Sequence, residues 1–452
     1  MKLSSVKIIN FRSIKNLEID FSKSCIGLIG LNESGKSNIL KALNYLDPVT
    51  QISILDIRQP TENEEPIKIS EIKFYFMLNQ QEAEQIYESL KPKALQKFWE
   101  TPLLRKNNKI YTLNNIQELL SKGVYKVDLV AKTAIYKCCS FIEGVELEDG
   151  WYSVSDKCPA DYKIADSSGH IINAKNLNLF RKEIIPKDVP TEYFIKATDI
   201  SVLEGLLVSK TISLIKTNHP KVLFWKYDEK MLLPPQVQLS EFQSDPDTCI
   251  TLKNLFELAG HDDITKAISK ARDGARPALG NLLRTISSKA TKHFRKVWKN
   301  YSDIDISLKI NGTYIDCFIK DTHNEYELSQ RSDGFKRFIT FLLLISTKVT
   351  TEQLRDCLLL IDEADACLHP AGVKYLRDEL IKISNTNKVV YSSHSIFMID
   401  RENIGRHFIV KKDKEITQAY VAEESNFRDD EVLFTALGSS IFEVLNKKNL
   451  LF

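Results

Sequence analysis

Near the N-terminus, two glycines, a lysine and a serine recur at the spacing of a loop that holds phosphate. The segment reads Gly30-Leu31-Asn32-Glu33-Ser34-Gly35-Lys36-Ser37. Glycine lets the backbone approach an anion closely, and the free N–H groups at a helix N-terminus point at it. Lys36 would then reach the β- and γ-phosphates of ATP, and the Ser37 hydroxyl would bind Mg²⁺. With ATP and Mg²⁺ as cofactors, the loop predicts nucleotide contacts at Asn32, Gly35, Lys36, Ser37 and Asn38.

Two adjacent acids end an apolar run much later in the chain. The run reads Cys357-Leu358-Leu359-Leu360-Ile361, and Asp362 and Glu363 follow it. We expect Asp362 to bind Mg²⁺ and Glu363 to be the general base that activates the attacking water. Residues 362–365 also spell the DEAD motif of RNA helicases. Helicase motifs lie much closer to their phosphate loop, and no segment like His-Arg-Ile-Gly-Arg follows here, so we favour the ATPase interpretation.

Two further anion-binding positions flank the acid pair. Ser332 and Gly334 open an apolar helix, where a serine and exposed amides could hold the γ-phosphate bound to an opposite protomer. The alternative is an ordinary turn and N-cap. His394 follows a strand-like run at 388–391, and we expect it to hydrogen-bond the γ-phosphate and sense its loss, as a catalytic partner of Glu363. The alternative is an exposed loop histidine.

Strands and helices must position these side chains. Apolar runs predict strands at 25–29, 67–78, 357–361 and 388–391. Helices are expected after the phosphate loop, over 80–90, along 338–345, and over most of 265–301 with a break near Pro277. The order of phosphate loop, serine-led helix, acid pair and histidine is that of an ABC-type nucleotide-binding head interrupted by a long insertion.

The fold class that we predict is α/β: an ABC-type P-loop ATPase head, split by a mixed α+β insertion with a short helical arm. Residues 1–78 would form the N-terminal lobe with the phosphate loop, and 303–440 the C-terminal lobe with the signature, acid pair and histidine. Between them we expect a variable insertion at 79–255 and the helical arm at 256–302. A tail follows at 441–452.

The predicted arm carries two kinds of side chain on different faces. An apolar face is formed by Leu283, Ile286, Ala290, Phe294 and Val297. Basic residues gather largely away from it, beside Trp298 and Tyr301: Lys292, Arg295, Lys296 and Lys299. Such a stripe could follow a nucleic-acid backbone without reading its sequence. The preferred alternative is an amphipathic helix that packs on the core and turns its charges to water.

Composition indicates a cytoplasmic protein. The chain has 452 residues, enough for a large core, and a net charge of only +2. Its start lacks the apolar region of a signal peptide, and its longest apolar run, at 338–345, is too short to cross a membrane. The eight cysteines show no Cys-x-x-Cys spacing and predict reduced packing residues rather than a zinc site.

The opening Ile9-Asn10-Phe11-Arg12-Ser13-Ile14 resembles the start of RecF- and SMC-type ATPase heads. That resemblance implies that Arg12 lies close to bound nucleotide. It also implies a homo-oligomer, at least a dimer, that closes around ATP. A repair or recombination ATPase of this kind, which binds DNA without a dedicated nuclease, is the alternative function for the chain.

Three stretches resemble the ATPase module of the overcoming-lysogenization-defect (OLD) nucleases: residues 331–338, 362–370 and 393–400. The resemblance covers roughly 1–45 and 255–450. The chain departs from the usual ABC signature at Asp333, where glycine is common, and at Phe335, where Gln or Glu is common. These two departures bear on how strongly the signature holds phosphate across the dimer.

In OLD nucleases a Toprim nuclease domain follows the head, and Asn449-Leu450-Leu451-Phe452 looks like the start of its first strand. The chain is therefore interpreted either as an ATPase subunit whose Toprim-type nuclease is a separate partner, as in split anti-phage systems resembling PARIS, or as the ATPase part of a longer nuclease. A nucleic acid or a phage protein is the expected trigger. No membrane partner is expected. A transporter head is disfavoured because the sequence shows no membrane segment and no transport-type signature.

Overall fold

The structure is a computed structural model of the chain. It describes residues 2–61, 64–90, 98–116, 119, 122–137, 145–165, 171–174, 180–181, 183, 190–197, 214, 217–274, 277–297, 304–321, 324–346, 348 and 355–423. The predicted tail at 441–452, and Trp298, Lys299 and Tyr301 of the basic stripe, lie outside these residues. The chain forms two compact units, one from 1–22 and 48–220 and the other from 23–47 and 221–452.

The second unit contains the motifs that carry chemistry, on a mostly parallel sheet. Its strands run in the order β15-β20-β21-β3-β22-β23. Their bounds are β15 Val222–Lys226, β20 Leu358–Asp362, β21 Lys388–Ser393, β3 Cys25–Ile29, β22 His407–Asp413 and β23 Ile416–Val421. Only β23 is antiparallel to its neighbour in this set. Strands β3 and β20 are buried along their whole length, as expected where both faces of a parallel sheet are covered.

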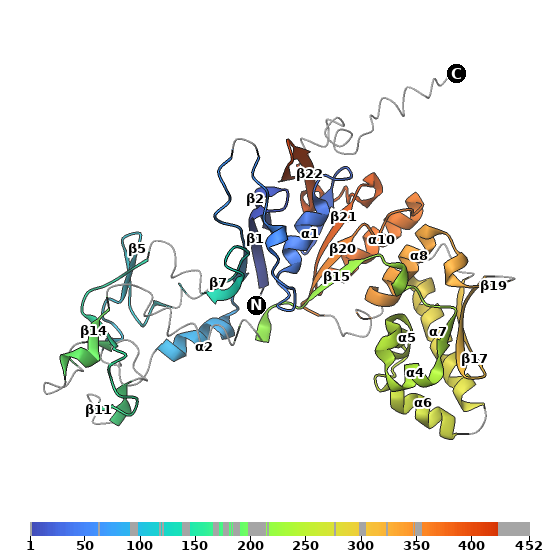
Figure 1. Ribbon diagram of the computed structural model, residues 1–452, viewed down its shortest axis with the longest axis horizontal. Helices are drawn as coiled ribbons and strands as arrows, with labels where there is room; N and C mark the ends of the chain where they lie inside the picture. Colours follow the sequence, from blue (N-terminus) through green and yellow to red (C-terminus); the bar gives the residue numbers. More distant parts are fainter. Residues whose placement is uncertain are drawn as a thin grey trace, which may run out of the picture. The chain divides into compact units, whose positions relative to one another are not determined.

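Helices pack on this sheet and begin at its carboxyl edge. Helix α1 (Lys36–Asn44) follows β3 and contacts β20 and β21, and α10 (Pro370–Ile383) follows β20 and contacts β21 (Figure 1). Because β3, β20 and β21 are parallel and in register, their carboxyl ends meet at one edge. That edge is where open α/β sheets place their ligands.

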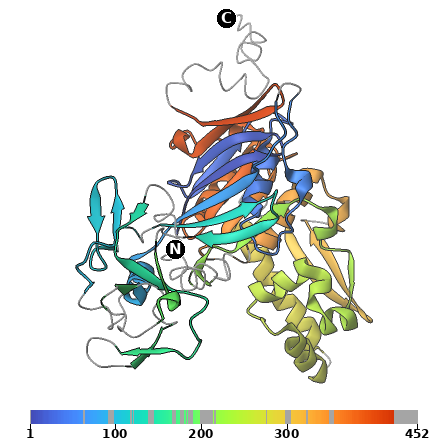
Figure 2. The same ribbon diagram turned by 60° about the vertical axis from the view of Figure 1, so that its left-hand side comes forward.

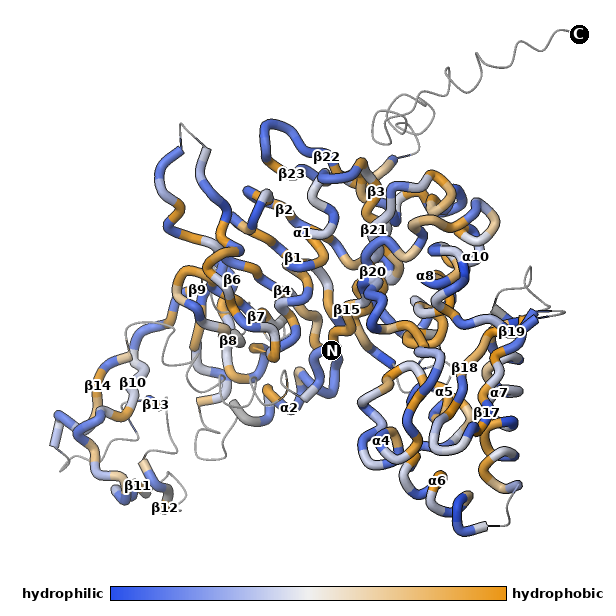
Figure 3. The backbone as a smooth tube through the Cα atoms, turned by 45° about the vertical axis from the view of Figure 1, so that its right-hand side comes forward, coloured by the Kyte–Doolittle hydropathy of each residue, from blue (hydrophilic) through white to orange (hydrophobic). Residues whose placement is uncertain are grey.

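A lobe of helices and a small antiparallel sheet completes the second unit. Its helices are α4 (Leu239–Ser244), α5 (Ile250–Leu258), α6 (Ile264–Asp273) and α7 (Ala278–Val297). The sheet has the order β16-β18-β17, from Gln236–Gln238, Tyr314–Lys320 and Asp305–Asn311, with β19 (Glu325–Tyr326) beside β18. Helix α7 lies along β17, with its apolar residues shown in orange in Figure 3.

The apolar face of α7 is a core face, which confirms the amphipathic interpretation of this helix. Leu283, Ile286, Ala290 and Phe294 are all buried. On the other side, Arg295 donates to Asp305 at 2.7 Å. This pairing offsets one charge of the predicted basic stripe.

The signature segment, residues 331–335, follows this lobe in the chain and leads into a helix. Helix α8 (Asp333–Phe341) is followed without a break by a π-helical turn, Leu342–Ser346. The side chains of Phe338, Ile339 and Phe341 are fully buried, so this helix is anchored in the core. π-helical turns are rare and occur often at functional sites.

The first unit is an antiparallel assembly that carries three smaller sheets (Figure 2). Its strands run in the order β2-β1-β4-β7-β8, from Ile14–Asp20, Lys2–Phe11, Glu71–Met77, Lys122–Asp128 and Thr133–Lys137. Helix α2 spans Gln80–Leu90. The small sheets contain β5 (Leu104–Lys106), β6 (Lys109–Tyr111), β9 (Val145–Leu147), β10 (Trp151–Val154), β11 (Lys163–Ala165), β12 (Ile171–Asn173), β13 (Phe180–Arg181) and β14 (Phe194–Lys196). An apolar core of the first unit lies among these small sheets and includes the fully buried Trp151 and Phe180.

Short 3₁₀ turns connect the elements, at Ile54–Asp56, Thr191–Tyr193, Glu229–Met231, Pro246–Cys249, Leu328–Gln330, Ile396–Met398 and Ile404–Arg406. The strands predicted around 25–29, 67–78, 357–361 and 388–391 are confirmed, as is the helix at 80–90. The helical stretch at 265–301 contains α6 and α7, with the break at the predicted position near Pro277. The predicted domain boundaries stay predictions. Among the described residues, no helix has the length and apolar character needed to cross a bilayer.

Candidate functional site

The phosphate loop opens α1 with its amides uncapped. Gly35 is the N-cap residue, with φ of +105°, and no side chain accepts a hydrogen bond at this helix start. The left-handed conformation favours glycine, and a Cβ at this position would come within 2.0 Å of the Thr417 hydroxyl oxygen. That hydroxyl donates to the carbonyl of Ser34 at 3.0 Å, so β23 is hydrogen-bonded to the loop. The Asn38 amide donates to the Gly35 carbonyl at 3.0 Å, so an anion would bind at the amides that precede it.

Lys36 is buried and lies across its own loop. Its ammonium donates to the carbonyl oxygens of Gly30 at 2.9 Å and Leu31 at 2.6 Å. Burial lowers the pKa of Lys36, while the nearby carboxylates of Glu363, Asp362 and Asp365 oppose this shift. The lysine therefore lies among the acids of the predicted site. Phosphate oxygens could accept hydrogen bonds from its ammonium in place of the two carbonyls.

Asp362 is the point where the motifs meet. The hydroxyls of Ser37 and Ser392 both donate to its Oδ1, at 2.9 Å and 2.7 Å. The ammonium of Lys226 lies 3.8 Å from its Oδ2. A hydroxyl and a carboxylate oxygen are ligands that Mg²⁺ prefers, so Ser37 and Asp362 fit the metal expected of them.

Sequence reasoning missed Ser392 and Lys226 as site residues. Register explains both, because Asp362 is paired with Lys226 of β15 on one side and with Ser392 of β21 on the other. A polar residue at the end of an apolar strand was the available signal in each case. The sequence does not show which strands are neighbours in the sheet.

Glu363 lies directly after β20 in an unusual backbone conformation. Its φ is +51°, which is costly for a residue with a side chain and recurs at functional sites as well as in tight turns. Its amide donates to the Ser392 hydroxyl at 3.0 Å, which fixes the turn. Half-buried Glu363 therefore directly follows Asp362 at the strand end, the position expected for a general base.

His394 is exposed just past β21. The residue before it, Ser393, donates to Asp365 at 2.6 Å and accepts from the Ser395 amide at 2.9 Å. Burial raises the pKa of Asp365, and the neighbouring His394 acts in the opposite direction. The structure therefore brings His394 to the same edge as the acid pair, by way of Ser393 and Asp365.

The signature segment contacts the turn that follows the acid pair in the same chain. Ser332 caps α8 by accepting from the Phe335 amide at 3.4 Å, and it is exposed. Gly334 is buried, and a Cβ there would lie 2.1 Å from the carbonyl oxygen of Cys367. Only glycine allows this approach. The start of α8 is therefore placed by the segment leaving β20.

The remaining predicted contacts lie in different settings. Asn32 is exposed in the phosphate loop, and Asn38 is half-buried in the first turn of α1. Arg12 belongs to the other unit, where its guanidinium pairs with Asp56 at 2.6 Å and its φ is +49°. Its closeness to nucleotide stays a prediction.

Strand, phosphate loop and helix, with an acid pair and a histidine at the ends of neighbouring parallel strands, define an ABC-type P-loop ATPase. The chain belongs to the AAA ATPase domain family, which it matches over residues 1–149 and 239–399. The gap in this match, from 150 to 238, agrees with a head that is split by an insertion.

Curated relatives point to the same class. The chain is 27% identical to the DNA replication and repair protein RecF of Rickettsia massiliae over 238 residues, which are 47% of this chain and 63% of that protein. It is 47% identical to the DNA double-strand break repair Rad50 ATPase of Methanococcus maripaludis over 45 residues, 10% of this chain and 4% of that one. An uncharacterized protein of Methanocaldococcus jannaschii is 26% identical over 183 residues, 37% and 46% of the two chains. The chain thus spans less than two thirds of each of these relatives.

Among solved structures, the SMC head bound to the C-terminal winged-helix domain of ScpA gives a TM-score of 0.47 at 15% identity, covering 95% of this chain and all of that one. The SMC head domain of Thermotoga maritima gives 0.39 at 11% identity, covering 94% and 100% of the two chains.

The contact between Gly334 and Cys367 generates a stability prediction. Gly334→Ala should lower the free energy of unfolding by about 1–3 kcal/mol, because the new methyl group collides with a backbone carbonyl that cannot move freely. Gly280→Ala in α7 is the matched control, since its Cβ meets nothing within 4 Å and should stabilise the helix by about 0.5–1 kcal/mol. Urea unfolding measures both. Equal stability of Gly334→Ala and the wild type would show that α8 does not depend on this contact.

Proposed function

We propose that the chain binds and hydrolyses ATP at the edge formed by β3, β20 and β21. The observation that carries the proposal is the hydrogen bond from Ser37 to Asp362 at 2.9 Å, with Glu363 next in the chain and buried Lys36 within electrostatic range of both carboxylates. The amides of α1 and Lys36 would hold the phosphates, and Glu363 would take a proton from the attacking water. Ser37 and Asp362 would hold Mg²⁺, which offsets phosphate charge when bound.

We further propose that two copies of the chain close around ATP. Ser332 is exposed at the start of α8 while Gly334 is fixed within its own chain, which suits a helix end that reaches a nucleotide on a second copy. A γ-phosphate held in this way would be bound by both copies, so hydrolysis would weaken the dimer. His394 would report the same event from the first copy.

The dimer would control a Toprim-type nuclease in anti-phage defence. The OLD-like stretches at 331–338, 362–370 and 393–400 support this role, because they include the acid pair and both flanking motifs. A nucleic acid or a phage protein would be the trigger. The second candidate is a DNA-repair ATPase without a nuclease, and the similarity to RecF over 47% of the chain favours it.

Removing the loop lysine should abolish nucleotide binding. For the wild type, Mg-ATP at a hundredfold over its dissociation constant should add about 2.7 kcal/mol of stability. Lys36→Ala removes the cation that faces the phosphates, so its thermal shift should vanish. Lys41→Ala, on the same helix, is the control and should keep the shift. Equal shifts in Lys36→Ala and the wild type would contradict the assignment of this site.

Glu363 should be needed for ATP hydrolysis but not for ATP binding. Glu363→Gln should keep the ATP-dependent thermal shift but slow hydrolysis by about 10²–10⁴-fold, because the amide cannot accept the proton. The variant should accumulate ATP-closed dimers in light scattering, and adding Ser332→Arg should prevent them. Exposed Glu402→Gln serves as control. Full turnover by Glu363→Gln would assign Glu363 a structural role instead.

The chain alone should hydrolyse ATP and leave DNA and RNA intact. Its acid pair, Asp362 and Glu363, is committed to the ATP site, so cleavage should require a Toprim-type nuclease. The test incubates purified protein with plasmid, Mg²⁺ or Mn²⁺ and ATP, with Lys36→Ala as control. Cleavage that co-purifies with this chain through a sizing column, with no second protein present, would overturn the division of roles. A protein that stimulates repair partners on DNA but no nuclease would favour the RecF-like alternative.

A further inference from the structure

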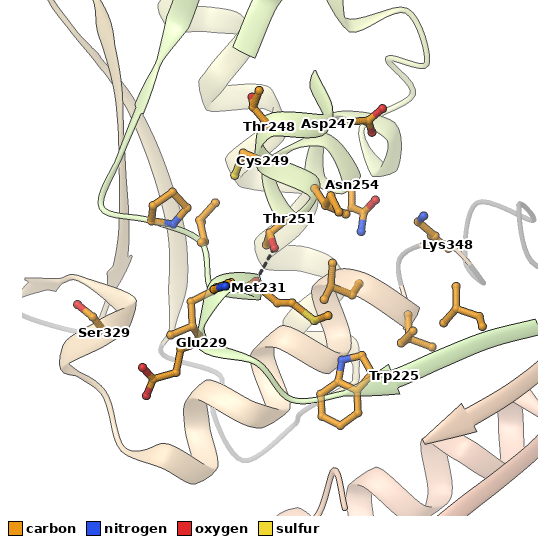
Figure 4. Close-up of a pocket in the computed structure, with 18 of the residues that line it drawn as sticks. Trp225, Glu229, Met231, Asp247, Thr248, Cys249, Thr251, Asn254, Ser329 and Lys348 are labelled. Atoms are coloured by element: carbon orange, nitrogen blue, oxygen red, sulfur yellow. Dashed lines mark hydrogen bonds between the residues drawn. The ribbon is translucent and has the colours of Figure 1, made fainter. Parts of the chain in front are cut away.

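A cavity of about 690 Å³ lies in the second unit, away from the phosphate loop. It is bounded by β15, the segment after it, the start of α5 and the π-helical turn after α8 (Figure 4). Its volume is that of a site for a small organic molecule. Buried apolar wall residues include Leu233, Leu344 and Ile345. None of the ATPase roles assigned above uses this space.

Two unpaired polar atoms lie in the cavity wall. Within the described part of the chain, neither the indole nitrogen of Trp225 nor Oδ1 of Asn254 has a hydrogen-bond partner, although both residues are at least 98% buried. In Figure 4 the nitrogen of Trp225 is turned toward the other lining side chains, and Asn254 and Thr251 come from the opposite wall. A buried polar atom without a partner is costly, so each needs an explanation. A bound molecule would supply one.

Three of the four charged lining residues, Glu229, Lys230 and Asp247, are exposed, and they include both signs of charge. The fourth, Lys348, is half-buried and already interacts with another group. A ligand that lies against the apolar walls of Leu233, Leu344 and Ile345 would therefore be neutral, because a charge on it would lack a free partner. It needs an acceptor for the Trp225 N–H and a donor for Asn254 Oδ1.

The wall of the cavity is connected to the ATPase motifs by three consecutive residues. Trp225 packs edge-on against Phe341 of α8, with ring centres 5.9 Å apart. Lys226 lies beside Asp362, and Tyr227 lies under the guanidinium of Arg337 of α8, 4.5 Å from the ring centre. On the opposite wall, Asn254 donates to the carbonyl of Leu343 in the π-helical turn at 3.0 Å. A ligand that moved Trp225 would move neighbours of both the acid pair and the signature helix.

We propose that this cavity is an effector site for a neutral, planar heterocycle that carries both a hydrogen-bond donor and an acceptor, such as a lactam or a nucleobase-like ring. Occupancy sets the position of Trp225 and, through Lys226 and α8, the rate of ATP turnover. The regulatory half of this proposal rests on the proposed ATPase function. The binding half does not.

The binding test uses quinolin-2-one, a bicyclic lactam, with naphthalene as the matched ring that lacks polar atoms. Saturation-transfer NMR titrations of the full chain should show saturable binding of the lactam. Trp225→Phe should weaken it by about 5- to 10-fold, the loss expected for one hydrogen bond. Cys249→Phe, which fills the cavity from its wall, should abolish binding, and a thermal melt confirms that the variant is folded. Equal affinities for lactam and naphthalene, or for wild type and Trp225→Phe, would overturn the site.

A second readout is protection of Cys249 from alkylation by N-ethylmaleimide, followed by peptide mass spectrometry. Exposed Cys367 is the internal control. The lactam should slow modification of Cys249 alone, and unchanged rates at both cysteines would overturn binding at this cavity. The lactam should also change ATP turnover of the wild type by at least about twofold, an effect missing in Trp225→Phe. Binding with unchanged turnover would overturn regulation only. A chain without ATPase activity would instead contradict the proposed function, while the NMR titration would still decide the cavity.

Discussion

The shared carboxylate of Asp362 is the contact on which the site depends. It accepts from Ser37 of the phosphate-loop helix and from Ser392 of the neighbouring strand, so one oxygen joins parts of the chain that are far apart in sequence. Buried carboxylates are stable only when their hydrogen bonds are satisfied. Three elements must therefore assemble correctly before this group can be buried. The long insertion between the loop and the acid pair is tolerated because the parallel strands, and not the connecting chain, set this geometry.

Charged side chains of both signs lie around that carboxylate. Lys36 and Lys226 provide the positive groups, and Asp362, Glu363 and Asp365 the negative ones. The three carboxylates outnumber the two ammonium groups, so a bound Mg²⁺ would have to offset part of the negative charge that the phosphates bring to this site. The unusual backbone at Glu363 fits the same need, since it turns the chain away from β20 while holding two adjacent acids at one strand end.

Local patterns in the sequence predicted much of the fold. The apolar runs before Gly30 and Asp362 are both buried strands, and the amphipathic face of α7 is a core face. The roles of Lys226 and Ser392 could not be predicted, because they depend on which strands are neighbours, and strand order is a long-range property. The cavity at Trp225 had no signal at all. Its walls come from β15, α5 and the end of α8, and buried wall residues such as Trp225, Leu233 and Leu344 look like ordinary core positions in the sequence.

The hydrogen bonds of Lys36 within its own loop have a consequence for binding affinity. Its ammonium is already bound by two carbonyls of its own loop, so nucleotide binding is an exchange reaction in which old bonds break as new ones form. The free energy of the bonds that are given up is subtracted from the affinity. The two carbonyls of the loop thus act as internal competitors for the ammonium, and an anion would bind Lys36 more weakly than it would bind an unpaired lysine.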